Sequence, residues 1–439
     1  MKLKASTLAV LALLASSPIL AADLMDVYRE ALSQDPVYAS ARYAYEVGKE
    51  AAPQARAGIL PSISFSLGGN RNHRDTEGLP TLDYNAHSYG VTLSQPLFRM
   101  ANWIVVDQAG LQVRQAEAVL ADASQTLIVR TAQAYFDVLL AQDNVSLSGA
   151  QKKAISEQLA QAKRNFEVGT ATITDTYEAQ AKYDLAIAKE ISDLNDLDIK
   201  QRALQQLIGK MPASLAPLRD NPKLSLPQPG DMEQWVTAAE EASPVIAQLR
   251  LNYEIAVKEI DRTKSGHLPT VDLTAGYSNS NSPITTSSGA FASMIDTKSG
   301  QIGFTLTVPI YQGGGTQSRI RQSLSAKERA AQDLENSKRT VAQSVRQSFL
   351  GVTNGVAQVK ALEAALVSNK SSLDATVLGK EVGVRTNVDV LNAQQQLFQA
   401  QRDLQQARYN TILSQLRLKS ATGRLKDTDL GEVNALLAK

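Results

Sequence analysis

The sequence of 439 residues contains no cysteine. A chain without cysteine has no disulfide framework, no thiolate metal site and no cysteine to carry a lipid anchor. Histidine is nearly as scarce, because only His73, His87 and His267 occur and they lie far apart. None of their spacings is that of metal ligands. The chain is therefore expected to bind no metal.

Catalytic and nucleotide-binding motifs are also lacking. Gly313-Gly314-Gly315 precedes a helical pattern, but no Gly-Lys-Ser/Thr follows, so this run is not a phosphate loop. No nucleophile elbow or acid–base pair stands out. The charge balance of 45 Lys and Arg against 44 Asp and Glu argues against a basic nucleic-acid-binding face. These absences predict a protein that is not an enzyme, uses no cofactor and binds no nucleic acid.

Long apolar runs are missing beyond the N-terminus. Residues 1–22 have the pattern of a signal peptide, with Lys2 and Lys4 before an apolar run and Ala21-Ala22 as a cleavage site. A retained anchor helix is the less favoured alternative, since the run is short for a bilayer. No later run has the length of a spanning helix, so membrane crossing would require a β-barrel.

What the sequence does contain is a segment that occurs twice. Residues 168–175 (VGTATITD) reappear as residues 382–389 (VGVRTNVD), and both copies interrupt long helical patterns. Glycine readily adopts the left-handed conformation that ends a helix. One such turn is weak evidence, but two copies in matching context predict the tips of two helical hairpins, at about 167–175 and 381–389.

The repeat extends well beyond these tips. Asp35-Pro36-Val37 is matched by Ser243-Pro244-Val245, and the matching residues that follow lie at the same distance along the sequence in both copies. Four prolines mark matching changes between helical and strand patterns, namely Pro61, Pro96, Pro269 and Pro309. The chain is thus predicted to be internally duplicated. Its expected parts are a first repeat, a second repeat and a C-terminal equatorial segment, at residues 23–230, 231–425 and 426–439.

Four segments alternate between apolar and small polar residues, as Ile63, Phe65 and Leu67 do with the intervening serines. This alternation predicts strands at about 61–70, 88–97, 269–278 and 301–310. A soluble hairpin packed on its own helices is one interpretation of a single pair. Strands of about ten residues with an apolar face are also typical of membrane β-barrels. Four strands are too few to close a barrel, so the membrane interpretation requires several copies of the chain.

The remaining sequence is mainly helical, with coiled-coil-like spacing of its apolar residues. Long helices are expected at about 101–167 and 315–381, and return helices at about 173–209 and 388–423. At ~1.5 Å per residue, each long helix would measure ~100 Å. The fold class is therefore predicted to be mainly α, with two long helical hairpins and four strands per chain.

In the residues of both tips, in 266–274 (GHLPTVDLT) and in 309–314 (PIYQGG), the chain resembles the TolC outer-membrane channel-tunnels of Gram-negative bacteria. The resemblance covers essentially the whole mature chain. It implies a homotrimer that forms one shared 12-stranded barrel in outer-membrane lipid and a helical tunnel in the periplasm. The implied partners are a periplasmic adaptor (membrane fusion protein) and an inner-membrane transporter of the ABC, RND or MFS class.

The same resemblance gives roles to residues at the tips. Asp389 matches the first position of a gate ring that binds cations, whereas Asn392 stands at a second position that is usually Asp. Arg385 is expected to lock the entrance against Thr174 and Asp175. Lys380 replaces another lock residue, and an ion pair with Asp175 is expected for it. The turns at Val168, Gly169, Val382 and Gly383 are expected to dock the adaptor.

Two functions are compatible with these features of the sequence. The favoured one is a passive exit duct for type I protein secretion, multidrug efflux or both, opened at its periplasmic end by the transporter and adaptor. The alternative is a periplasmic coiled-coil adaptor or scaffold without a pore. An adaptor would carry one hairpin and compact β-domains, whereas this sequence predicts two hairpins and only four strands. For Arg385 and Asp175, the alternative to a lock is a solvated surface pair, worth ~0–1 kcal/mol.

Overall fold

The computed structural model describes residues 21–211, 214–286 and 291–438. The predicted signal peptide therefore lies outside the described residues, except for Ala21 and Ala22. The chain divides into two compact units. Of the described residues, those within 1–42, 120–244 and 338–439 make up unit 1, and those within 43–119 and 245–337 make up unit 2.

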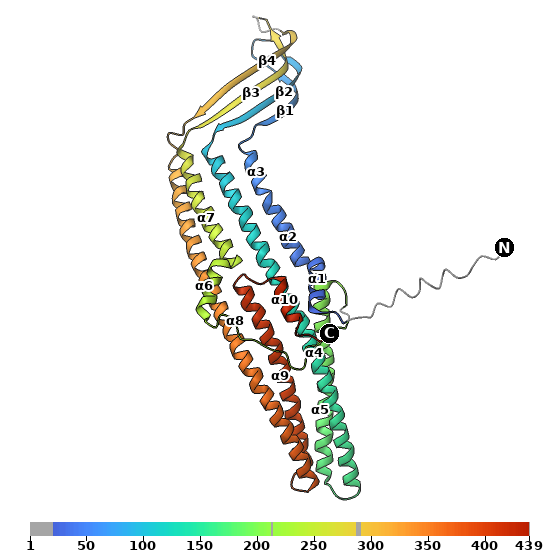
Figure 1. Ribbon diagram of the computed structural model, residues 1–439. Helices are drawn as coiled ribbons and strands as arrows, with labels where there is room; N and C mark the ends of the chain where they lie inside the picture. The colour runs from blue at the N-terminus through green and yellow to red at the C-terminus, as the bar shows by residue number, and fades with distance from the viewer. Residues whose placement is uncertain (1–20, 212–213, 287–290, 439) are drawn as a thin grey trace, which may run out of the picture. The chain divides into compact units, whose positions relative to one another are not determined.

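Unit 2 contains a four-stranded antiparallel sheet in the order β1-β2-β3-β4 (Figure 1). The strands are β1 (Ser62–Arg74), β2 (Leu82–Phe98), β3 (Thr270–Thr285) and β4 (Phe291–Thr307). They are longer than the predicted ten residues because backbone pairing continues into the polar ends, as at His73↔Asp83 and Asn281↔Asp296. Within one chain, β1 and β4 are the two edges of the sheet.

The apolar residues of the four strands gather on one face of this sheet. The register pairs Phe65 with Val91, Val91 with Tyr277 and Leu273 with Phe304, which carries the alternation from strand to strand. These apolar side chains are exposed in the single chain; Phe65 is 68% exposed and Phe304 is 72% exposed. A large exposed apolar face of this kind marks a surface that is covered by another molecule or by lipid.

Three of the four prolines lie next to the ends of strands, where the sequence predicts changes of structure. Pro61 precedes β1, Pro269 precedes β3 and Pro309 follows β4. Pro96 lies inside β2 rather than at its end, and the pairing register with β3 shifts between Pro96 and Phe98. Beyond this bulge, Nε and Nη2 of Arg99 donate to the two carboxylate oxygens of Asp272 at 2.8 and 2.7 Å. This ion pair connects the end of β2 to the start of β3.

The helices of the first repeat are α1 (Leu24–Gln34), α2 (Pro36–Lys49), α3 (Ala51–Ala57), α4 (Met100–Glu167) and α5 (Ile173–Ile208). Those of the second repeat are α6 (Met232–Ala242), α7 (Pro244–Lys264), the short 3₁₀ helix η1 (Ser265–His267), α8 (Gly315–Glu381) and α9 (Asn387–Ala421), followed by α10 (Asp427–Asn434). A break separates α1 from α2 before Pro36, and an equivalent break separates α6 from α7 before Pro244, because proline cannot continue a helix from the preceding turn.

The core of unit 1 lies where α1, α4, α5, α9 and α10 meet. Its fully buried side chains include Leu24, Tyr135, Phe136, Ile412 and Leu430. The Tyr135 hydroxyl donates to the carbonyl of Ala216 at 2.8 Å, so this buried polar group has a partner. The irregular segment after α5 thereby becomes part of the core.

A second feature of unit 1 is the close contact between α8 and α9. Gly355 of α8 faces Thr411 of α9 so closely that a Cβ atom at position 355 would lie 2.5 Å from the Thr411 hydroxyl oxygen. Small residues of this kind permit the two helices of the hairpin to approach. Among the described helices, none combines the length and the apolar composition that crossing a membrane would need.

Candidate functional site: the two hairpin tips

The first tip connects α4 to α5 within unit 1. Helix α4 ends at Glu167, Gly169 has a left-handed φ of 77°, and the Thr170 amide donates to the Asn165 carbonyl at 2.8 Å. Thr172 then caps α5. Its side chain accepts from the Asp175 amide at 3.3 Å, while the Asp175 carboxylate accepts from the Thr172 amide at 3.0 Å. This is a capping box, which satisfies two amides at the helix start.

The second tip has the same construction between α8 and α9. Helix α8 ends at Glu381 and Gly383 has a φ of 82°. Thr386 caps α9 through a second capping box, in which Asp389 has the place that Asp175 has in the first. Val168 and Val382, next to the two glycines, are exposed by 72% and 67%. The repeated sequence therefore folds into two equivalent turns, each with an exposed valine.

Asp389 has a local structural role besides its predicted place in a gate ring. One of its oxygens, Oδ2, accepts from both the amide and the hydroxyl of Thr386 at 2.9 Å. These hydrogen bonds, with a smaller contribution from the charge of Arg385, hold the pKa of Asp389 below its ordinary value. Asn392 is exposed and lies three residues farther along α9, on the same side of the helix.

Lys380 makes two side-chain contacts at the second tip. Its ammonium group donates to Oε1 of Gln161 on α4 and to Oδ1 of Asn387, both at 2.9 Å. Within the described residues of one chain no contact joins Lys380 to Asp175, so the expected ion pair stays a prediction. Burial lowers the pKa of Lys380 from its ordinary value. Lys380 still joins the two hairpins, but through an amide.

Arg385 is exposed beside Gly379 at the second tip, and its amide donates to the Gly379 carbonyl at 3.1 Å. Within the described part of one chain, no contact joins Arg385 to Thr174 or Asp175. A lock made of these residues therefore stays a prediction, and it requires a second copy of the chain.

Sequence reasoning missed the polar contacts between the two hairpins above the tips. Lys182 of α5 donates to Gln395 of α9 at 3.0 Å. Asp193 of α5 is buried and forms ion pairs with Lys189 and Arg402. Single polar residues at helical spacing carry no sign of being buried, because the same pattern is typical of solvated helix faces. Only the packing of α5 beside α9 distinguishes them.

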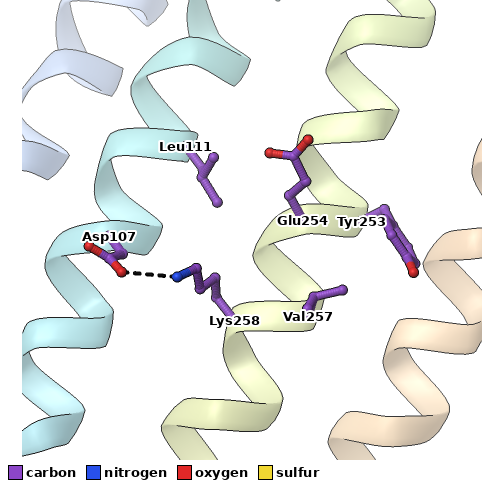
Figure 2. A pocket seen from close by; sticks show the side chains of 6 residues that line it. All are labelled: Asp107, Leu111, Tyr253, Glu254, Val257 and Lys258. Carbon is purple, nitrogen blue, oxygen red and sulfur yellow. Dashed lines mark hydrogen bonds and ion pairs between the residues drawn. The ribbon is translucent and has the colours of Figure 1, made fainter.

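Unit 2 holds a separate groove of about 530 Å³ between α4 and α7 (Figure 2). The Lys258 ammonium group donates to Asp107 at 3.0 Å across this groove, and Tyr253 and Glu254 precede Lys258 on α7. Its described lining has no histidine, serine, threonine or cysteine, and so no hydroxyl–histidine or thiol–histidine pair. Over the described residues, no group of three or more metal-ligating side chains occurs either.

The chain is similar to known proteins over almost its whole length. A model of the family described as outer membrane efflux protein matches residues 27–210 and 235–424. The chain is 35% identical over 423 residues to the outer membrane protein TolC of Vibrio cholerae serotype O1, covering 96% of this chain and 95% of that protein.

Two further relatives extend the comparison. The alkaline protease secretion protein AprF of Pseudomonas aeruginosa is 31% identical over 421 residues, which are 94% of this chain and 86% of that protein. Among solved structures, the CmeC outer membrane channel of Campylobacter jejuni superposes with a TM-score of 0.80 at 16% identity, covering 94% of this chain and 90% of that chain.

Proposed function

The chain belongs to the outer membrane efflux protein family, and on this premise we propose that its two hairpin tips form the gated periplasmic entrance of a trimeric exit duct. The protein is an outer-membrane conduit and not an enzyme. Three copies contribute their four-stranded sheets to one shared barrel. The exposed apolar face of the sheet supports this assembly, because in lipid that face is no longer in contact with water.

The proposed cargo is a protein of type I secretion, a drug-like molecule or both. A relative named for alkaline protease secretion supports the first, and the match to the family described as outer membrane efflux protein supports the second. The duct is a passive conduit. An inner-membrane ABC, RND or MFS transporter supplies the energy, and a periplasmic adaptor docks at the tip turns formed by Val168-Gly169 and Val382-Gly383.

The proposed gate ring consists of one Asp389 from each copy. Its lowered pKa keeps this carboxylate ionised at neutral pH, and its Oδ1 atom takes no part in the hydrogen bonds to Thr386. Three carboxylates close together attract cations into the entrance. Asn392 adds hydrogen-bonding capacity but no charge, so the ring carries three negative charges and not six.

The proposed lock joins Arg385 of one copy to Thr174 and Asp175 of the next copy. The single chain supports this role because Arg385 is exposed and no ion pair or side-chain hydrogen bond is found for its guanidinium among the described residues; its charge acts on Asp389 only from a distance. Lys380 adds a contact inside each copy, through Gln161 of the other hairpin. Of the four prolines proposed to mark junctions between strands and helices, Pro61 and Pro269 precede strands, Pro309 follows one, and Pro96 lies at the bulge near the end of β2.

The test is single-channel conductance of the purified protein in a planar bilayer, for the natural chain and for Arg385→Ala. We expect a small conductance that rises in the variant, because one contact of the lock is lost. Arg202→Ala is the matched control, since Arg202 pairs with Asp198 on the exposed face of α5. Equal conductance of natural chain and Arg385→Ala would remove the lock. A protein that never inserts would instead favour the scaffold without a pore.

A further inference from the structure

Helices α5 and α9 come from different hairpins and lie side by side in unit 1 (Figure 1). Asp193 of α5 is 5% exposed, although it is a carboxylate. Its Oδ1 atom accepts from Lys189 of the same helix at 2.6 Å, and its Oδ2 atom lies 3.8 Å from Nη2 of Arg402 on α9. One buried carboxylate is thus held between a cation of its own hairpin and a cation of the other.

Because Asp193 is buried, the ion pair between the two hairpins affects the free energy of holding them together. Nε and Nη2 of Arg402 are shielded from solvent and make no hydrogen bond to the described residues, and the same is true of Oδ2 of Asp193. A buried charge without a compensating partner is costly. Asp193 compensates Arg402 only while α9 remains beside α5. Separation of the two helices leaves Arg402 without this carboxylate, whereas Asp193 keeps Lys189 of its own helix.

Apolar contacts also join the two hairpins on the side of the pair nearer the tips. There Leu391 of α9 packs against buried apolar residues of the first hairpin, among them Ile155 and Leu159. A cavity of about 230 Å³ lies in the same place, and its lining includes Ile155, Leu391 and Arg402. The ion pair therefore adds a charged contact between α5 and α9 next to this apolar cluster.

The pair is also well separated from the tips. Asp193 lies 18 positions after Asp175, and Arg402 lies 13 positions after Asp389. At ~1.5 Å per residue, these separations are about 27 Å and about 20 Å. The proposed lock at Arg385 therefore does not contact this pair.

We propose that Asp193 and Arg402 form a second latch, within each copy of the chain, that holds the second hairpin against the first while the duct is closed. This inference rests on the proposed function, since it concerns the opening of the same entrance. It differs from the lock in three ways: it lies inside one chain, it is buried, and it joins the helices above the tips. Opening of the entrance by displacement of α9 requires the pair to separate.

The test compares Arg402→Gln, Asp193→Asn and the double variant with the natural chain in planar bilayers. We expect the fraction of time spent open to rise about fivefold or more in each single variant, which is the lower end of usual couplings between distant sites. The double variant should rise no further, because both substitutions remove the same interaction. Arg402→Lys retains the charge and should lie closer to the natural chain.

Two controls separate a latch from a merely structural pair. Arg202→Gln removes a cation from the exposed face of the same helix α5 and should leave the open fraction unchanged. The thermal stability of the trimer is measured for every variant. A loss of stability without a change in open fraction would show that the pair only supports the fold, and would overturn the proposal.

The remaining outcomes are also distinct. If Arg385→Ala opens the duct and Arg402→Gln does not, or if Arg402→Gln lowers the open fraction, the latch is wrong and the proposed gate stands. If neither variant changes the conductance of an inserted trimer, the proposed gate at the tips fails together with the latch. Additive effects in the double variant would show that the two residues act independently.

Discussion

At the scale of single residues, the tips show how one side chain serves two purposes. Asp389 both completes the capping box of α9 and is the proposed ring carboxylate, so its removal disturbs the turn as well as the charge. Asn392 has no such constraint, because it is exposed and lies beyond the first turn of α9. The charge of the entrance is therefore best altered at position 392.

Asn392→Asp adds three carboxylates to the proposed trimer ring. We expect a divalent cation to block the variant at a concentration about tenfold lower, since two charges of a cation at ~5 Å from one added carboxylate gain about 1.7 kcal/mol even in water. The measurement is the half-blocking concentration in planar bilayers. Asn410→Asp adds the same charge farther along α9 and should change little. Equal block in both variants would place the cation elsewhere than the ring.

Lys380 gives a prediction about pH. Because burial lowers its pKa, the folded protein holds this proton more weakly than the unfolded chain does. The free energy of unfolding contributed by Lys380 should therefore rise with pH between the folded pKa and the ordinary lysine range. We expect the melting temperature of the natural chain, relative to Lys380→Gln, to increase as the pH is raised above neutral. A difference that stays constant or falls would contradict this assignment.

At the scale of helices and strands, much of the structure is visible in the sequence and some of it is not. Helix α4 begins one residue earlier than expected, and helix α8 begins at the expected residue. Both could be predicted because proline, glycine and the apolar period mark the ends of these helices. The strands are longer than predicted, because the backbone hydrogen bonds between strands continue past the point where the alternation of apolar residues ends. The contact of Asp193 with Arg402 had no sequence signal, because helical periodicity does not say which polar residue faces another helix.

Two glycines of the long helices offer a matched pair of substitutions. A Cβ at Gly149 would have its nearest neighbour at 3.7 Å, whereas at Gly355 it would collide with Thr411 of α9. Gly149→Ala should raise the stability by about 0.5–1 kcal/mol through lower backbone entropy of the unfolded chain. Gly355→Ala should lower it by about 1–3 kcal/mol through overpacking. Thermal unfolding of both variants measures this, and equal shifts would mean that α8 and α9 are not in close contact at that position.

At the scale of the whole molecule, the family accounts for a surface that the single chain leaves exposed. The apolar face of the sheet includes Phe65, whereas Ser64 points to the opposite face by the alternation of the strand. If the apolar face contacts lipid, Phe65→Arg should cost about 2–4 kcal/mol at mid-depth of the membrane. Ser64→Arg faces the lumen and should be tolerated. The amount of assembled trimer in outer-membrane fractions distinguishes them, and equal yields would contradict the assignment of the lipid face.

The open sheet has a consequence for biogenesis. Within one chain, β1 and β4 both present unpaired backbone groups, next to an apolar face that water does not favour. Exposed strand edges promote pairing with other chains and aggregation. A newly exported chain therefore has two unpaired strand edges until it assembles with the other copies of the trimer. Rapid trimerisation would cover these edges, so a chain produced faster than it can assemble should aggregate or be degraded rather than accumulate as a stable monomer.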